Sequence, residues 1–103
     1  MTDEMLDQNI ESDISNLFKV LSNPTRIRIL YIIKQQPLTV TAISEKLNIS
    51  QSAISHQLRE LKLARLVKYT KQGREIIYEL DDDHVHDIFD MAIEHVKEIY
   101  NYE

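Results

Sequence analysis

Two short runs with the apolar spacing of helices stand next to each other in the middle of the chain, over residues 40–47 and 51–63. Only Asn48-Ile49-Ser50 separates them, and serine is a favourable residue for the N-cap of a helix. In the second run Ile54, Leu58 and Leu61 recur at i, i+4 and i+7, which leaves the opposite face polar. Two helices joined by so short a turn form a helix-turn-helix pattern.

Helical spacing also covers the chain before this pattern. Apolar residues recur over residues 10–21 at the intervals of an amphipathic helix. Asn23 is a good N-cap and Pro24 suits a first helical position, so a second helix is predicted over residues 24–35. Its expected buried residues are Ile27, Leu30 and either Tyr31 or Ile33.

A hairpin and a last helix follow. Strands are predicted over residues 66–70 and 75–80, joined by a polar turn over 71–74 that holds Gly73, the only glycine in the chain. A helix then runs from residue 81 or 82 to about 100, with its apolar face formed by Val85, Ile88, Phe89, Ala92 and Val96. The predicted fold is mainly α with a β-hairpin wing, a winged helix-turn-helix in the order α-α-α-α-β-β-α.

The net charge of −5 is unevenly distributed. Residues 76–103 hold nine acidic side chains against one lysine, whereas residues 40–75 hold seven Lys and Arg against three Glu. The middle of the chain can therefore attract DNA, while its last part repels it.

The residue types that are missing exclude several classes of function. Without cysteine there is no disulfide, thiolate metal site or thiol switch. Nothing resembles a signal peptide or a membrane-spanning run, so we expect a cytoplasmic protein without membrane contact. Four histidines without a nucleophile motif or a glycine-rich phosphate loop predict that the chain is not an enzyme.

The polar face of the second helix of the pattern is the predicted DNA-reading surface. Its residues are Gln51, Ser52, Ser55, His56 and Arg59. Ser and Gln can hydrogen-bond base edges in the major groove of double-stranded DNA, and Arg can bind phosphate or guanine. In the wing, Lys71, Gln72 and Arg74 suit the DNA backbone or the minor groove. The alternative is that both are ordinary solvated faces.

The last helix carries possible metal ligands near both ends, Asp82 and His84 at its start and His95 and Glu98 at its end. The two histidines lie within about 20° of one face but about 16 Å apart along the axis, too far to share one zinc ion. Two copies packed antiparallel would bring Asp82 and His84 of one subunit against His95 and Glu98 of the other. A homodimer would then have two symmetric sites.

The donor set fits more than one interpretation. Two imidazoles and two carboxylates suit tetrahedral zinc, with cobalt and nickel also open, and the absence of thiolate argues against copper(I) or cadmium. Alternatively, Asp81, Asp82 and Asp83 only cap the helix and complement its dipole, while the histidines are solvated. His86 either joins a larger coordination sphere or is simply exposed.

Three segments resemble the ArsR/SmtB family of metal-responsive repressors: residues 23–30 (NPTRIRIL), residues 47–58 (LNISQSAISHQL), and the wing from Lys71-Gln72-Gly73-Arg74 to Tyr78. The resemblance covers nearly everything from the first helix onward. It implies that Asp82, His84, His95 and Glu98 form an inter-subunit zinc site on the terminal helices. It also implies that the metal-free dimer binds an inverted-repeat operator and that metal releases the DNA, which derepresses metal efflux or storage genes.

Electrostatics alone predicts the opposite response, because added dications reduce the repulsion between acidic helices and DNA. We therefore expect zinc to act by geometry, fixing the reading helices in an arrangement mismatched to the half-sites. The far nitrogen of His84 or His95 could transmit this through a backbone carbonyl around Arg65.

The expected organisation is a single domain over residues 1–103. Within it, residues 1–22 form an N-terminal dimerisation helix, 40–63 the helix-turn-helix, 66–80 the wing, and 81–102 a helix for metal binding and dimerisation. The alternative functions are a winged-helix regulator of the same architecture without a metal response, and a metal buffer.

Overall fold

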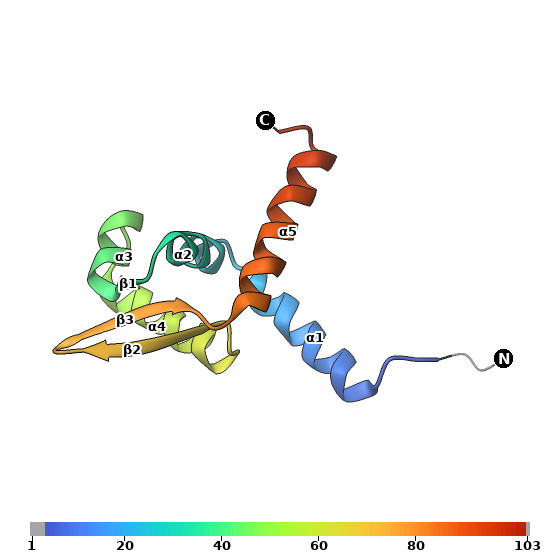
Figure 1. Cartoon of the computed structure of the whole chain (residues 1–103), viewed down its shortest axis with the longest axis horizontal. Helices are drawn as coiled ribbons and strands as arrows, with labels where there is room; N and C mark the ends of the chain where they lie inside the picture. Colours follow the sequence, from blue (N-terminus) through green and yellow to red (C-terminus); the bar gives the residue numbers. More distant parts are fainter. Residues whose placement is uncertain (1–3, 103) are drawn as a thin grey trace.

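The computed structural model describes residues 4–102, which form five helices and three strands. Residues 1–3 and 103, at the limits of the predicted domain, lie outside this part. The elements are α1 (Gln8–Leu21), α2 (Pro24–Gln35), β1 (Leu38–Thr39), α3 (Val40–Leu47), α4 (Gln51–Leu63), β2 (Val67–Gln72), β3 (Glu75–Leu80) and α5 (Asp83–Ile99). Helices α2, α3 and α4 and the hairpin form one body, from which α1 and α5 diverge (Figure 1).

Local capping residues set the helix boundaries. The side chain of Asn23 accepts a hydrogen bond of 3.1 Å from the backbone N–H of Arg26 at the start of α2. Ser50 does the same for Ala53 at the start of α4, at 3.2 Å. Asn48 ends α3 in the left-handed conformation, with φ 56°, which asparagine tolerates better than most residues. The helix-turn-helix pattern of α3 and α4 is therefore confirmed, with Asn48 and Ser50 in its turn.

The wing is tighter than predicted. β2 and β3 pair along their whole length, which leaves a two-residue turn of Gly73 and Arg74. Lys71 and Gln72, predicted in the turn, lie in β2 instead. Gly73 has φ 63°, a conformation that favours glycine, and a turn of this length allows strand pairing to continue to the tip.

A short third strand completes the sheet. β1 pairs antiparallel with β3, in the order β1-β3-β2. This strand was not predicted, because two residues are too few to show an alternating pattern.

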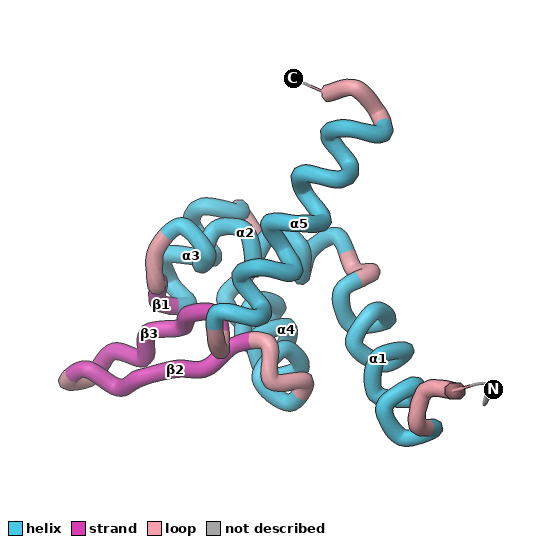
Figure 2. Tube along the Cα trace, turned by 45° about the vertical axis from the view of Figure 1, so that its right-hand side comes forward, coloured by secondary structure: helices cyan, strands magenta, loops and turns pink. Residues whose placement is uncertain are grey.

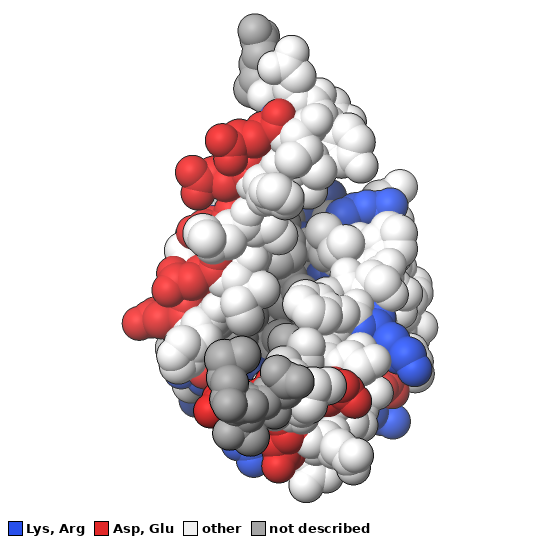
Figure 3. All heavy atoms as spheres, turned by 90° about the vertical axis from the view of Figure 1, so that its right-hand side faces the viewer, with Lys and Arg blue, Asp and Glu red and all other residues white. Residues whose placement is uncertain are grey.

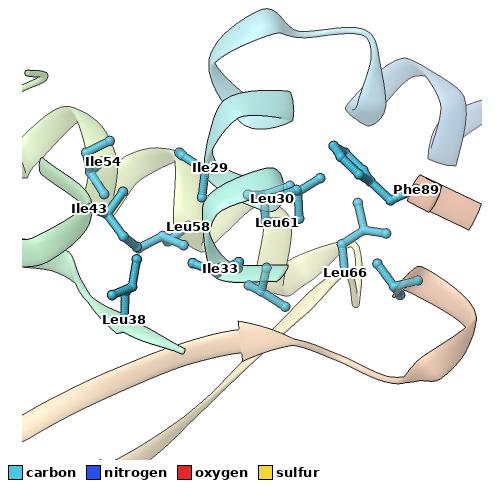
Figure 4. Packing of buried hydrophobic residues seen from close by; sticks show 12 residues of the cluster. Ile29, Leu30, Ile33, Leu38, Ile43, Ile54, Leu58, Leu61, Leu66 and Phe89 are labelled. Atoms are coloured by element: carbon cyan, nitrogen blue, oxygen red, sulfur yellow. The ribbon is translucent and has the colours of Figure 1, made fainter. Parts of the chain in front are cut away.

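The core lies between α2, α3, α4 and the sheet (Figure 4). Its members that are entirely shielded from solvent include Ile29, Leu30, Ile43, Ile54, Leu58 and Leu61. For α2, the buried member of the alternatives Tyr31 and Ile33 is Ile33, at 2% exposed. The prediction was wrong for Ile27, which is 42% exposed, and Tyr31 is 47% exposed. Both face the side where α1 and α5 diverge: Ile27 lines a groove with residues of those helices, and Tyr31 packs against Phe89, with ring centroids 6.3 Å apart.

The two diverging helices contribute little to the core. No residue of α1 is buried, and α5 buries only Val85 and Phe89. Figure 2 shows both helices extending away from the body of the molecule. Within residues 4–102, none of the helices combines the length and the apolar character needed to cross a membrane.

Candidate functional site

The predicted reading residues share one exposed side of α4. Gln51, Ser52, Ser55, His56 and Arg59 are all exposed. The opposite side of the helix is anchored in the core by Ile54, Leu58 and Leu61, which are fully buried. A helix held by three buried residues presents its polar face in a fixed orientation, as base reading in a groove requires.

The wing contacts the C-terminal end of α4, the predicted reading helix. The ammonium of Lys62, near the end of α4, lies 4.3 Å from the ring centroid of Tyr69 in β2, a cation–π contact. Tyr69 also packs against Tyr78 of β3, with centroids 5.6 Å apart. These contacts fix the base of the hairpin relative to α4, while Lys71, Gln72 and Arg74 are exposed further along it. The sequence pattern did not indicate this link.

Asp82 has two structural roles at the start of α5. Its Oδ1 accepts a hydrogen bond of 3.0 Å from the backbone N–H of Val85, which makes it the N-cap. Its Oδ2 lies 3.5 Å from Nδ1 of His84. The hydrogen bond from Val85 and then the His84 imidazole hold the pKa of Asp82 below its ordinary value of 3.8. The carboxylate is therefore ionised at neutral pH.

The other two predicted ligands lie far from this pair. His95 and Glu98 are exposed near the opposite end of α5. Over residues 4–102, one copy of the chain brings no three His, Asp or Glu side chains close enough to hold a metal ion. A single subunit thus joins Asp82 to His84 but does not join them to His95 and Glu98, as the length of the helix requires.

Three of the four predicted ligands, all except the N-cap Asp82, belong to a longer stripe on α5, which we call the α5 stripe. Its residues follow one another at intervals of four, three, four and three: His84, Ile88, Met91, His95 and Glu98. This is the spacing with which one helix packs along another. Ile88 and Met91, at its middle, are 43% and 66% exposed. The stripe is therefore an unpartnered seam with apolar residues at its centre and polar donors at its ends.

His86 lies off this stripe. Two residues correspond to a rotation of about 200°, so His86 is on nearly the opposite side of α5 from His84. Its Nδ1 lies 3.2 Å from Asp90, whose other carboxylate oxygen is 2.6 Å from the ammonium of Lys34 in α2. These contacts direct His86 toward the body of its own subunit.

A further polar contact joins the reading helix to its neighbours. Nε of Arg26 donates a hydrogen bond of 2.7 Å to Oε1 of Gln57, a half-buried residue on the flank of α4. Neither residue was singled out from the sequence, because they lie 31 positions apart and no local pattern links them.

An apolar groove of about 420 Å³ separates α1 from α5. It is lined mainly by aliphatic side chains of these helices, among them Leu17, Leu21, Ile88, Ala92 and Val96. Figure 3 shows acidic side chains along one edge of α5, with an uncharged surface between them and the Lys and Arg on the other side of this view.

Comparison with known proteins identifies the family. The family described as "Bacterial regulatory protein, arsR family" matches residues 23–69. The "Transcriptional repressor SmtB homolog" of Synechocystis is 34% identical over 95 residues, which cover 92% of this chain and 72% of that protein. The "HTH-type transcriptional regulator NmtR" of Mycobacterium tuberculosis is 37% identical over 95 residues, 92% of this chain and 79% of that protein. These relatives are regulators of transcription and not enzymes, which confirms that expectation.

Solved structures support the fold. A domain from Mycobacterium bovis, described as a homodimeric winged helix-turn-helix DNA-binding domain, superposes with a TM-score of 0.84 at 22% identity. The match covers 94% of this chain and 92% of that one. The chain is therefore a winged helix-turn-helix member of the arsR family of bacterial regulatory proteins.

Proposed function

We propose that this chain is a metal-responsive transcriptional repressor that works as a homodimer in the cytoplasm. The metal-free dimer binds an operator with inverted half-sites. Zinc, or else cobalt or nickel, binds at two sites between the α5 helices and releases the DNA, which allows metal efflux or storage genes to be transcribed. The observation that carries the proposal is the α5 stripe, with polar donors at both ends and exposed apolar residues between them.

The shape of the single chain supports a dimer. A compact chain of 12.1 kDa has an accessible surface of about 6,000 Å², whereas this chain has 7979 Å². Its radius of gyration is 15.8 Å, against about 13 Å for a compact chain of this length. Helices α1 and α5, which extend away from the body, contribute to this excess, and both leave apolar side chains exposed. The similar domain from Mycobacterium bovis is described as homodimeric.

Antiparallel packing of two α5 helices would give the α5 stripe a partner along its whole length. A two-fold axis near residue 90 places Ile88 and Met91 of both subunits at the centre of the seam. The same symmetry sets Asp82 and His84 of one subunit opposite His95 and Glu98 of the other. Dimerisation through this helix thereby assembles two equivalent donor sets.

These donors fit a divalent metal. Two imidazoles and two carboxylates match the nitrogen and oxygen ligands of four-coordinate zinc. Asp82 is already ionised, as metal binding requires, and its Oδ2 lies beside Nδ1 of His84 while Oδ1 keeps the helix cap. A bound metal would supply a rigid crosslink between the α5 helices. One relative has a name in keeping with such a response, the "Cadmium resistance transcriptional regulatory protein CadC homolog" of Staphylococcus aureus, which is 35% identical over 88 residues.

The DNA interface follows from α4 and the wing. The exposed face of α4 enters the major groove, with Gln51, Ser52 and Ser55 nearest its N-terminal end, which contacts the bases in helix-turn-helix proteins. Arg59, Lys71 and Arg74 supply positive charge for the backbone. In a dimer, two such surfaces read half-sites about one helical turn apart, roughly 34–36 Å.

The direction of the response must come from geometry. The dimer carries twice the formal charge of −5 of one chain, so added dications reduce its repulsion from DNA. Release therefore requires that the metal hold the α5 helices in an arrangement that misplaces the reading helices. One route runs from the far nitrogen of His84 or His95 to a backbone carbonyl around Arg65, where the chain leaves α4.

A titration of operator DNA tests the proposal. The probe is the duplex that the metal-free protein selects from a randomised library, labelled for fluorescence anisotropy. We expect zinc to weaken its binding by roughly 5- to 150-fold, the usual range of allosteric coupling. His84→Ala and His95→Ala remove this effect, whereas His86→Ala, a histidine of the same helix that lies off the stripe, retains it. Cobalt and nickel, titrated in the same way, rank the three metals.

The same proteins and DNA duplex distinguish the proposed function from two alternative functions. A winged-helix regulator without a metal response would bind the duplex equally with and without zinc and retain no zinc in equilibrium dialysis. A metal buffer would bind zinc in dialysis without any change in DNA affinity. Release by zinc from the His95→Ala protein would exclude the α5 sites.

A further inference from the structure

Arg26 lies at the point where three helices meet. It is near the start of α2, and its guanidinium donates through Nε to Oε1 of Gln57 in α4 at 2.7 Å. A second nitrogen, Nη1, donates to the backbone carbonyl of Val20 in the last turn of α1, at 3.5 Å. A single half-buried side chain therefore connects α1, α2 and α4.

The chemistry of arginine suits this position. Its planar fork presents several donors in fixed directions, so it can bind two acceptors on different helices at once. The carbonyl of Val20 is one of the last four of α1, which have no partner within the helix and attract positive charge. A lysine at position 26 has one ammonium on a flexible stem and would not hold both contacts in a fixed geometry.

The contact on α4 falls beside the reading surface. Gln57 is half-buried on the flank of the helix, between the buried Leu58 and the exposed His56. A hydrogen bond at this place adds to the three buried residues of α4 in resisting rotation of the helix about its axis. Such a rotation would turn Ser55 and Arg59 away from the bases. Arg26 thus links the orientation of the reading face to α1.

Helix α1 is the other end of this link. It buries no residue within one chain, and its exposed Ile10, Ile14 and Phe18 form an apolar face. In the proposed homodimer this face packs against the second subunit, so the position of α1 is set by the dimer. Through Arg26, the dimer geometry reaches α4.

We propose that Arg26 is a positioning residue that fixes the separation and orientation of the two reading helices, and thereby the half-site spacing that the dimer accepts. This inference rests on the proposed function, since it requires a dimer that binds inverted half-sites. Adding one base pair between half-sites moves one of them by about 3.4 Å and rotates it by about 35°. A dimer with rigidly tied reading helices must discriminate strongly between such operators.

The experiment compares spacings rather than a single affinity. Metal-free protein is titrated with the selected duplex and with versions whose central spacer is one or two base pairs longer or shorter. We expect the wild-type protein to bind each altered spacer about tenfold or more weakly, as for the loss of a specific base contact. Arg26→Lys and Gln57→Ala flatten this profile to about threefold or less. Arg28→Lys, an exposed arginine of the same helix, leaves it unchanged.

The outcomes separate the inference from the function on which it rests. Unchanged spacing profiles in folded Arg26→Lys and Gln57→Ala proteins would overturn the role of Arg26 while leaving the repressor intact. An equal loss of affinity at every spacing would also overturn it, because that result indicates lower stability of the fold. Failure of the wild-type dimer to select any duplex would overturn the proposed function itself.

Discussion

The ammonium of Lys34 on α2 lies 2.6 Å from Oδ1 of Asp90 on α5, and the Lys34 side chain is only 14% exposed. Over residues 4–102, the remaining ion pairs are within the hairpin or within α5 and its N-cap. This pair therefore joins the helix with the predicted metal ligands to the body with the reading helix. Beside it, Val85 and Phe89 are the buried anchors of α5.

Exchanging the two charges tests this connection. Lys34→Asp and Asp90→Lys each place like charges together and should lower the temperature of thermal unfolding. The double variant restores an opposite pair and should recover about half or more of the loss, which a double-mutant cycle measures. If the loss of thermal stability in the double variant equals the sum of the losses in the two single variants, the ion pair contributes no interaction energy. The metal response of the double variant then reports whether the connection is needed for release.

The ion pair of Lys34 and Asp90 also predicts that the stability of the fold decreases at acid pH. The hydrogen bond and charge of Lys34 hold the pKa of Asp90 below its ordinary value of 3.8. Because the pKa of Asp90 is lower in the folded state, its ionised carboxylate stabilises the fold at any pH above its pKa in the unfolded chain. This contribution is lost as the pH falls through the pKa of the folded state. Asp90→Asn should therefore reduce the loss of stability between about pH 5 and pH 2, measured by urea unfolding. Glu94→Gln, which removes one charge from the same helix, is the matched control, and an equal effect in both would contradict a specific role of the pair.

Mixed dimers test whether each metal site is shared between subunits. Homodimers of His84→Ala or of His95→Ala should each lose both sites. In a mixed dimer of the two variants, purified through different tags, one site contains both substitutions and the other contains neither. We expect this mixed dimer to regain one zinc site in equilibrium dialysis. If each site belonged to a single subunit, the mixed dimer would bind no zinc.

The wing and the reading helix should differ in their dependence on salt. Lys71→Ala and Arg74→Ala remove charges proposed to contact phosphate, and each should lower the slope of log affinity against log salt by about 0.9. Ser55→Ala should leave the slope unchanged and relax the preference for one base pair, at a cost of about 1–3 kcal/mol for a lost base contact. Fluorescence anisotropy at several salt concentrations gives both quantities. A lower slope for Ser55→Ala, or unchanged slopes for the wing variants, would contradict the assignment.

Local chemistry made much of the fold predictable. The N-caps Asn23 and Ser50 act on residues three positions away, so their function can be inferred from the sequence alone. The buried face of α4 follows from spacing, and Gly73 has the positive φ that its place in a tight turn suggests. The strand β1 escaped prediction because its partner β3 lies about forty residues away.

The features that could not be predicted depend on contacts between residues far apart in the sequence or between two subunits. Ile27 lines a groove that no segment within residues 4–102 fills, and Tyr31 packs against Phe89 while it stays 47% exposed. The contact of Arg26 with Gln57 leaves no pattern in the sequence because it depends on how α2 and α4 pack. For α5, helical geometry shows that one subunit cannot close a site from the predicted ligands at both ends of the helix, and the proposed pairing of two α5 helices rests on symmetry rather than on local sequence.

If the exposed apolar face of α1 is covered only in the proposed homodimer, the amount of working repressor depends on the rate at which the cell makes it. A helix that buries no side chain within its own chain is stabilised by the arrival of a second copy, so its stability rises with concentration. Newly made copies that have not met a partner would present this helix to proteases and be removed first. Repression would then set in above a threshold of synthesis instead of growing in proportion to it.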